Sequence, residues 1–338
     1  MPYRLLINLC HFLRRHWRAL LLVLLPGIGG IALAASVPDV DGTRHNLSVS
    51  ANIISPAGSF GTTVKATSET QICVFCHTPH AATSGGTVVA PLWNRALSTQ
   101  TYTFYNSSSM DASPLPGGAG TGNPLGGVGV GSKLCLSCHD GTLAIGTIGV
   151  LNNAPGKVNM QGTNPAGTDG VMPDANATVG TDTGYTRNIG INLTNDHPIS
   201  FTYDAGLATA DGELYTPGGA VASRVRGQPR PQFPLVGPLG GQGNQVECVT
   251  CHDPHLNDAS ANNKFLRGNR LQVTANQVDG TFDKDNDIMC LACHTKPGWG
   301  ASAHGNSSVA AELYESTAAS LRDFPTNTTV WQSACLAC

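Results

Sequence analysis

Apolar residues recur at regular intervals in two short segments of the chain. In residues 197–203, HPISFTY, the side chains of Ile199, Phe201 and Tyr203 can face one side of a short strand. In residues 308–323, SVAAELYESTAASLRD, apolar residues lie near one face of a predicted helix. We expect further single helical turns at the cysteine motifs described below.

Glycine and proline interrupt much of the remaining chain. The 338 residues include 40 Gly and 21 Pro, whereas only 12% are charged and 6% are aromatic. These residues concentrate in segments 114–131, 152–170 and 217–243, which we expect to be loops. The sequence therefore predicts a coil-dominated, mostly irregular fold with few short helices and short strands. Something other than regular secondary structure has to organise such a fold.

Residues 1–34 have the features of an export signal peptide. A basic stretch with four Arg is followed by an uncharged run from Ala19 to Pro38, and Ala32 and Ala34 form an A-x-A cleavage pattern. The uncharged run is 20 residues long, so an uncleaved membrane anchor is the alternative. A proline and three glycines in the middle of the run disfavour a spanning helix, and we predict cleavage.

The mature chain is acidic. Loss of the four Arg in residues 1–34 leaves 15 Lys and Arg against 22 Asp and Glu, a formal net charge of −7. An acidic protein is a poor candidate for nucleic-acid binding. Export would place the chain in the periplasm, outside the cell or at the surface of an outer membrane.

Ten of the eleven cysteines form Cys-x-x-Cys pairs. The pairs are Cys73/Cys76, Cys135/Cys138, Cys248/Cys251, Cys290/Cys293 and Cys335/Cys338. In the first four pairs the next residue is a histidine, namely His77, His139, His252 and His294. This spacing is typical of c-type haem attachment, in which two thiols bond to the porphyrin and the adjacent histidine ligates iron from the proximal side. The sequence therefore predicts four haem c groups.

Two other chemistries use the same cysteine spacing. Zinc sites combine such pairs in twos, but they do not need a histidine directly after each pair. Dithiol redox sites occur once per thioredoxin-like unit, within a βαβ pattern that this sequence lacks. A fifth haem is predicted at Cys335/Cys338, on the interpretation that the sequence stops one residue short of the histidine. The alternatives there are a disulfide or a haem without its proximal ligand.

Five further histidines match the five attachment sites in number. They are His45, His80, His197, His255 and His304, and we predict that they are distal iron ligands. Met110, Met160 and Met172 are the alternative distal ligands. His80 and His255 stand in Cys-x-x-Cys-His-x-Pro-His segments, where three residues are too few to reach the opposite face of the same porphyrin. Each is therefore expected to serve a neighbouring haem.

The motifs are arranged in two quasi-repeats within a predicted domain over residues 35–338. The repeats cover approximately residues 45–204 and 245–338, and the domain is expected to be truncated at its C-terminus. Five sites leave about 60 residues to cover each haem, which is too few to isolate the haems from one another. We therefore expect short elements wrapped around a haem stack that forms the core.

The chain resembles the multihaem c-type cytochromes with doubled motifs, including the outer-surface and filament-forming cytochromes of metal-respiring bacteria. The segments that carry the resemblance are CVFCHTPH from Cys73, CLSCHDGT from Cys135, NDHPISFTYD from Asn195 and CVTCHDPH from Cys248. The resemblance implies bis-histidine haems of low potential, a loop-dominated fold and periplasmic or extracellular electron transfer. Some similar proteins polymerise, with one distal histidine supplied by the neighbouring subunit. The missing histidine after Cys338 departs from the pattern.

Electron transfer through closely packed bis-histidine haems is the leading functional hypothesis, with the chain as a carrier rather than an enzyme. Its partners would be redox proteins or extracellular acceptors, and a homo-oligomer or filament is a further expectation. The alternative is a multihaem reductase of small oxyanions such as nitrite, which needs one haem with an open iron position. A structural metal-binding module is the third hypothesis.

Overall fold

The structure is a computed structural model that describes thirteen parts of the chain. These are residues 40–51, 64–80, 92–108, 110–112, 127–152, 154–173, 187–217, 233–240, 243–256, 264–274, 282–313, 324 and 327–337. The chain divides into two compact units, Met1–Ala35 and Ser36–Cys338, and every described residue belongs to the second. The predicted signal peptide and Cys338 lie outside the described residues. Within the described ranges, no helix combines the length and apolar character needed to span a bilayer.

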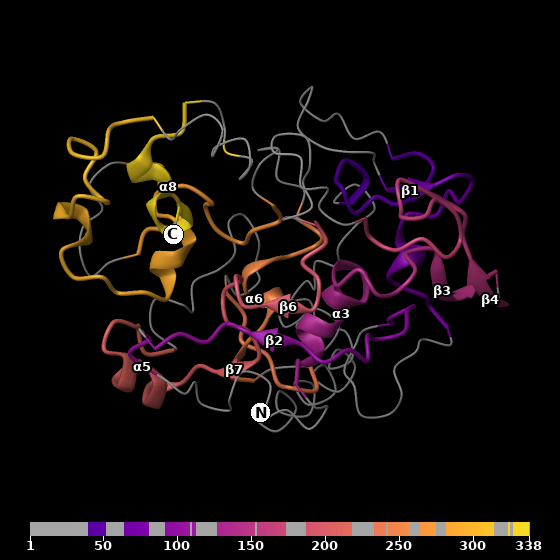
Figure 1. Ribbon diagram of the computed structural model, residues 1–338, viewed down its shortest axis with the longest axis horizontal. Helices are drawn as coiled ribbons and strands as arrows, with labels where there is room; N and C mark the ends of the chain where they lie inside the picture. The colour runs from indigo at the N-terminus through magenta and orange to yellow at the C-terminus, as the bar shows by residue number, and fades with distance from the viewer. Residues whose placement is uncertain are drawn as a thin grey trace, which may run out of the picture. The chain divides into compact units, whose positions relative to one another are not determined.

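Irregular backbone dominates the described residues, as the sequence predicts (Figure 1). The α-helices are α3 (Val130–His139), α5 (Ala205–Asp211), α6 (Cys248–Cys251) and α8 (Val330–Ala337). The 3-10 helices are η2 (Cys73–Phe75), η4 (Met289–Ala292) and η5 (Trp299–Ala301). Five of these seven elements contain cysteines of the Cys-x-x-Cys motifs, so most of the helical structure serves those motifs.

Within the described residues, strands pair only in twos. The antiparallel pairs are β1 (Lys65–Ala66) with β5 (Met160–Gln161), β3 (Thr147–Leu151) with β4 (Ala154–Lys157), and β7 (Phe201–Thr202) with β8 (Gln245–Val246). The parallel pair is β2 (Thr103–Phe104) with β6 (Asn192–Leu193). Three of the four pairs join segments that are far apart in the sequence, so these short sheets hold distant loops together by backbone hydrogen bonds.

The strand predicted over residues 197–203 is present but shorter. Phe201 and Tyr203 are buried, as the alternating pattern requires, but strand pairing begins only at Phe201. Ser200 adopts a positive φ of 61°, which ends regular extended backbone in front of the strand. Its hydroxyl accepts a hydrogen bond from the Gly129 amide at 3.1 Å, so a tertiary contact accompanies this local conformation.

The helix predicted over residues 308–323 is wrong for its described part. Residues 308–313 form turns, and Leu313 makes an isolated antiparallel bridge with Thr329. Val309 and Leu313, two of the apolar residues expected near one face of that helix, are 56% and 59% exposed. Backbone hydrogen bonds to the start of α8 outweigh helix propensity here, because the Trp331 amide donates to the carbonyl of Ala310 at 3.1 Å. Residues 314–323 lie outside the described residues.

The hydrophobic core of the described part is divided into four small clusters. The largest consists of Val64, Ala66, Val74, Phe75, Ile145, Ile148, Val158, Met160 and Met172. Cys76 and Cys138 pack against this cluster, and Cys293 packs against two others. Met160 and Met172, the alternative ligands, are buried as core residues. Attachment motifs thus lie beside each of these small clusters.

The two Cys-x-x-Cys-His-x-Pro-His segments have the same backbone arrangement. The motif histidine forms an antiparallel bridge with a later residue in both, His77 with Trp93 and His252 with Leu266. In the first segment the amide of Asn94 donates to the carbonyl of Cys76 at 2.9 Å. In the second the amide of Arg267 donates to the carbonyl of Cys251 at 2.8 Å. Asn94 and Arg267 therefore occupy equivalent places.

The side chains of these two equivalent residues also hold the motifs. Asn94 Nδ2 donates to the carbonyl of Val74 at 2.6 Å, and Arg267 Nε donates to the carbonyl of Val249 at 2.9 Å. Asn94 further exchanges hydrogen bonds with the backbone of Val150 in β3, at 3.0 and 2.8 Å. In each segment, one buried polar side chain thus hydrogen-bonds to a backbone carbonyl of the Cys-x-x-Cys turn and holds that turn in place.

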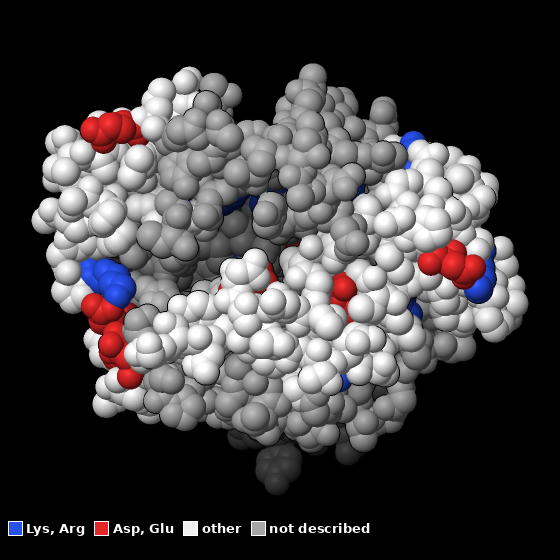
Figure 2. All heavy atoms as spheres, in the orientation of Figure 1, with Lys and Arg blue, Asp and Glu red and all other residues white. Residues whose placement is uncertain are grey.

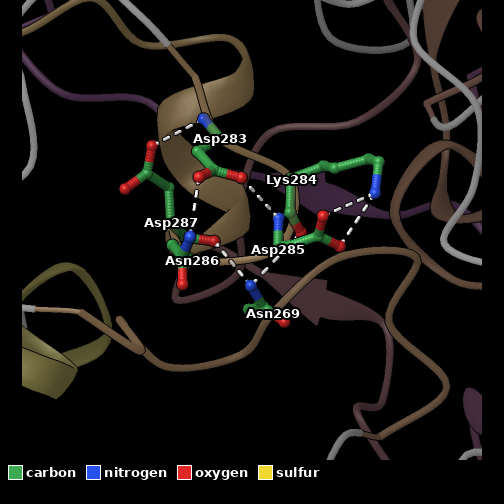
Figure 3. A network of polar contacts seen from close by, with 6 residues as sticks. All are labelled: Asn269, Asp283, Lys284, Asp285, Asn286 and Asp287. Atoms are coloured by element: carbon green, nitrogen blue, oxygen red, sulfur yellow. Dashed lines mark hydrogen bonds and ion pairs between the residues drawn. The ribbon is translucent and has the colours of Figure 1, made fainter.

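The loop of residues 283–287, which leads into η4, is held by hydrogen bonds between its own polar groups (Figure 3). The carboxylate of Asp283 accepts the amide of Asp285 at 2.9 Å, and the Asp283 amide donates to the carboxylate of Asp287 at 2.7 Å. Asn269, buried nearby, donates to the carbonyl of Asp287 at 3.2 Å. The loop is therefore held from within and from a separate segment, which positions Cys290 three residues after it.

Replacement of Asn94 by Ala is expected to lower the free energy of unfolding by about 2–4 kcal/mol, because backbone groups of Val74 and Val150 lose their partners inside the protein. Denaturant unfolding of the purified protein measures this loss. The matched control is Asn159→Ala at an exposed position, for which we expect a change within about 0.5 kcal/mol. An equal loss of unfolding free energy in the two variants would show that the hydrogen bonds of Asn94 to Val74 and Val150 do not stabilise the fold.

Candidate haem sites

Each of the four complete motifs is a helical turn that brings its first cysteine and its histidine to one side. The histidine amide donates to the carbonyl of the first cysteine in three of them, at 2.8 Å for His77, 2.9 Å for His252 and 3.0 Å for His294. The fourth motif, Cys135–His139, lies at the end of α3. The prediction of short helical turns at the motifs is confirmed, and Cys335 likewise lies in α8.

Six of the nine predicted iron ligands meet in pairs. The ring centres are 5.9 Å apart for His77 and His255, 6.2 Å for His45 and His139, and 6.4 Å for His197 and His294. Each pair combines one histidine that directly follows a Cys-x-x-Cys motif with one of the five further histidines. His255 therefore lies against the histidine of a different motif from its own.

The separation within each pair fits a shared metal ion. With a metal–imidazole bond of about 2.0 Å and about 1 Å from the nitrogen to the ring centre, two rings on opposite sides of one metal have centres about 6 Å apart. The observed range of 5.9–6.4 Å agrees with this value. The residues present thus fit the axial ligands of a bis-histidine haem, with the four equatorial positions left for the porphyrin.

Three predicted ligands have no histidine ring against them in the described part of the chain. His80 and His304 are exposed, and neither makes a ring contact with another histidine there. His252 is also exposed, and its Nδ1 donates to the carbonyl of Lys264 at 2.8 Å. The structure therefore brings together three pairs of predicted ligands, and within the described residues it places no second histidine ring against His252.

Backbone carbonyls orient four of the nine predicted ligand rings. Nδ1 is hydrogen-bonded to the carbonyl of Pro254 in His45, of Arg187 in His139, of Pro198 in His197 and of Lys264 in His252. A carbonyl can only accept, so Nδ1 must carry the proton in each of these rings. Nε2 then keeps its lone pair and is the nitrogen available to a metal.

Burial favours the neutral, metal-binding form of three predicted ligands, His45, His139 and His294. It lowers the pKa of His45 to about 4, with the neighbouring His139 adding to the effect. Burial also lowers the pKa of His139 and His294, and in His139 the hydrogen bond to Arg187 opposes it. Neutral imidazole is the ligating form, so the rings need not lose a proton to bind iron.

The thiols of consecutive motifs are neighbours in chain order. Burial, followed by the thiol of Cys138, raises the pKa of Cys76 to about 12, and burial, followed by Cys293, raises that of Cys251 to about 12. A hydrogen bond between thiols links Cys135 with Cys248, raising the first pKa and lowering the second. Cys335 lowers the pKa of Cys290 in the same way. The five Cys-x-x-Cys pairs therefore form a sequence of adjacent groups.

A buried carboxylate joins the second and third motifs. Glu247, in front of α6, is fully buried and accepts the hydroxyl hydrogen bonds of Ser132 in α3 and, at 2.9 Å, of Ser200. The Ser132 hydroxyl also accepts the amide of Cys248 at 2.9 Å. Glu247 forms a capping box with Thr250 that starts α6. Sequence reasoning missed this group, because Glu247 and Thr250 stand in the reverse order of the usual Ser/Thr-x-x-Glu capping box.

Metal ligands of other types do not gather in the described residues, where no group of three or more His, Cys, Asp or Glu could hold an ion. The histidines meet instead in twos. Compared with known proteins, the chain matches no family model and no curated sequence. The candidate sites therefore rest on the motifs and on the geometry of the ligand pairs.

Replacing Glu247 with Gln is expected to stabilise the protein at neutral pH. Burial raises the pKa of this carboxyl, against the opposing hydrogen bonds of Ser132 and Ser200. Folding therefore disfavours the charged form, and stability falls as the pH rises through the pKa of the folded state. Glu247→Gln removes the charge but keeps an oxygen acceptor for both hydroxyls.

Thermal unfolding between pH 4 and pH 8 measures this effect. The Tm of Glu247→Gln should exceed that of the wild type at pH 8, and the difference should shrink as the pH falls toward the ordinary glutamate value of 4.5. Glu312→Gln at an exposed position is the control, with an expected change within about 0.5 kcal/mol. A Glu247→Gln variant that is less stable at pH 8 than at pH 4, relative to the wild type, would contradict the assignment.

Proposed function

We propose that this chain is an exported multihaem c-type cytochrome that carries electrons. The single observation that supports the proposal most is the set of three histidine pairs with ring centres 5.9–6.4 Å apart. Each pair joins the histidine of a Cys-x-x-Cys-His motif to a histidine from a distant segment. The chain would hold iron in six coordination at these three sites, which suits electron transfer and leaves no position for substrate.

Adjacency of the sites supports transfer between them. The thiols of each motif lie beside those of the next, and α3 and α6 are in contact. The tripeptide 253–255 touches two ligand pairs at once, because His255 lies against His77 and the Pro254 carbonyl accepts the His45 ring. Short elements would then wrap around a stack of haems, and four to five haem c groups would form one continuous path.

The surface offers few charges to a partner. On the face that Figure 2 shows, the charged side chains of described residues are few and scattered. Two of the exposed ion pairs, Lys157 with Asp169 and Lys284 with Asp285, cancel their own charges. On this face, contacts with redox proteins or with extracellular acceptors would depend little on charge. No nucleic-acid partner is proposed.

Polymerisation is a second part of the proposal, supported by the unpaired ligands. His80 is exposed, and His252 is exposed without a histidine ring against it in the described residues. A histidine of a second copy can complete a site of this kind, which would continue the haem path from one subunit to the next. Electron microscopy of the purified protein tests this, since filaments are expected and a monodisperse monomer with all haems in six coordination would contradict it.

Intact mass and spectra of the purified, exported protein test the main proposal. We expect the mass of the mature chain plus at least four covalent haems and the spectra of low-spin six-coordinate iron. A mass without haem would overturn haem attachment. Turnover of nitrite together with a substantial high-spin signal would favour a reductase instead of a carrier.

Removal of a distal ligand tests the pairing itself. His197→Ala should leave the mass unchanged apart from the substitution and convert one haem to the high-spin form, because His294 loses its opposite ligand. Electron paramagnetic resonance measures the conversion. In a background with Cys290→Ala and Cys293→Ala, which removes that haem, His197→Ala should cause no further spectral change. A high-spin signal that persists in this background would assign His197 to another haem.

A further inference from the structure

His255 differs from four other predicted ligands in the group that faces its Nδ1 atom. Its Nδ1 lies 3.4 Å from Oδ1 of Asp253, whereas four other ligand rings donate to backbone carbonyls. The acceptor is therefore a full negative charge rather than a dipole. Among the described ligand rings whose Nδ1 partner is known, only that of His255 faces a carboxylate.

The carboxylate of Asp253 is fixed where it stands. It is 5% exposed at its side chain, and its Oδ2 lies 3.2 Å from a guanidinium nitrogen of Arg267, which is 9% exposed. Oδ1 also accepts the backbone amide of His255 at 3.1 Å. Buried charges are poorly screened by salt, so this carboxylate acts on His255 at close range.

We propose that Asp253 is a positioning residue that makes the site of His77 and His255 the lowest-potential haem of the three paired sites. The inference rests on the proposed haem function. A carboxylate that accepts the Nδ1 proton raises the basicity of Nε2, and a more basic ligand stabilises oxidised iron over reduced iron. A carbonyl acceptor has a weaker effect. Arg267 limits the effect by balancing part of the charge.

The same site has a second feature that makes it identifiable. The ring planes of His77 and His255 are 21° apart, whereas those of the other two pairs are 71° and 74° apart. Parallel imidazoles donate to the same iron d orbital, and perpendicular ones donate to two different orbitals. Parallel ligands therefore give a rhombic low-spin resonance, and perpendicular ligands give a highly anisotropic one. The site next to Asp253 should be the rhombic one of the three.

The first Cys-x-x-Cys-His-x-Pro-His segment supplies a natural comparison. Thr78 stands where Asp253 stands in the second segment, and its hydroxyl accepts the amide of His80 at 3.4 Å, as Asp253 does for His255. Thr78 therefore retains the turn contact but carries no charge. Asp253→Thr copies this arrangement, keeps an acceptor for the His255 amide and removes the negative charge.

Redox titration of the haem-loaded protein, followed by paramagnetic resonance, tests the proposal. In Asp253→Asn and Asp253→Thr the midpoint potential of the rhombic signal should shift to a more positive value, while the two anisotropic signals keep theirs. In Arg267→Gln, which keeps an amide donor for Val249, the rhombic midpoint should shift to a more negative value. The opposite signs keep the test decisive even where one variant folds poorly.

Asp196→Asn is the matched control. Asp196 precedes His197, whose ring donates to the Pro198 carbonyl instead. The control removes the same charge beside another ligand and should leave the rhombic midpoint unchanged. An unchanged rhombic midpoint in all Asp253 variants, or an equal shift of all signals, would overturn the role of Asp253.

Failure of the haem proposal gives a different result. A wild-type protein without covalent haem, or without low-spin iron, would overturn the proposed function before any variant is measured. Low-spin haems at full mass with a rhombic midpoint that does not respond to Asp253 would leave the proposed function intact and refute this inference alone.

Discussion

Pairs of imidazole rings about 6 Å apart tie together segments that the chain separates widely. The pairs are His45 with His139, His77 with His255, and His197 with His294. Closing loops of this length costs conformational entropy, and strand pairs of two to five residues and four small apolar clusters offer little to offset it. A metal centre held by both rings of each pair would supply the missing cohesion, since binding of a metal by distant ligands contributes directly to folding. The described fold thus joins distant loops at these histidine pairs.

The backbone around each motif serves to aim the rings. Helical turns bring cysteine and histidine to one side, and backbone carbonyls fix Nδ1 in four of the rings, three of them from a separate segment. Such an acceptor has to come from a segment with irregular backbone, because carbonyls within helices and sheets are already paired. The loop content that glycine and proline impose therefore has a use. It leaves carbonyls such as those of Pro254 and Lys264 free to turn toward ligand rings.

The sequence predicted local features well and long-range features poorly. Cysteine spacing indicated the helical turns, and glycine and proline content indicated the irregular fold, because both depend on neighbouring residues. The alternation around Phe201 gave the buried face correctly, but the positive φ of Ser200 shortened the strand through a tertiary contact. The helix around Leu313 was overridden by hydrogen bonds to α8. The partner of each histidine and the buried Glu247 depend on contacts across more than 40 residues, which no local pattern encodes.

The two Cys-x-x-Cys-His-x-Pro-His segments share one backbone arrangement but differ in charge before their second histidine. Thr78 before His80 is neutral, and Asp253 before His255 is a carboxylate. The bridges of His77 with Trp93 and of His252 with Leu266 show that the turn itself tolerates either Thr78 or Asp253. Burying a carboxylate is costly without compensation, so the second segment also needs a buried cation, and Arg267 stands where the first segment has Asn94. The two differences belong together, because neither the carboxylate nor the guanidinium would be stable in that place alone. A chain that needed only to hold haem would gain nothing from this pair. If the chain carries haems at unequal potentials, Asp253 and Arg267 would make the potential at one site differ from that at the others. The turn otherwise repeats that of the first segment, with Thr78 and Asn94 in the same places.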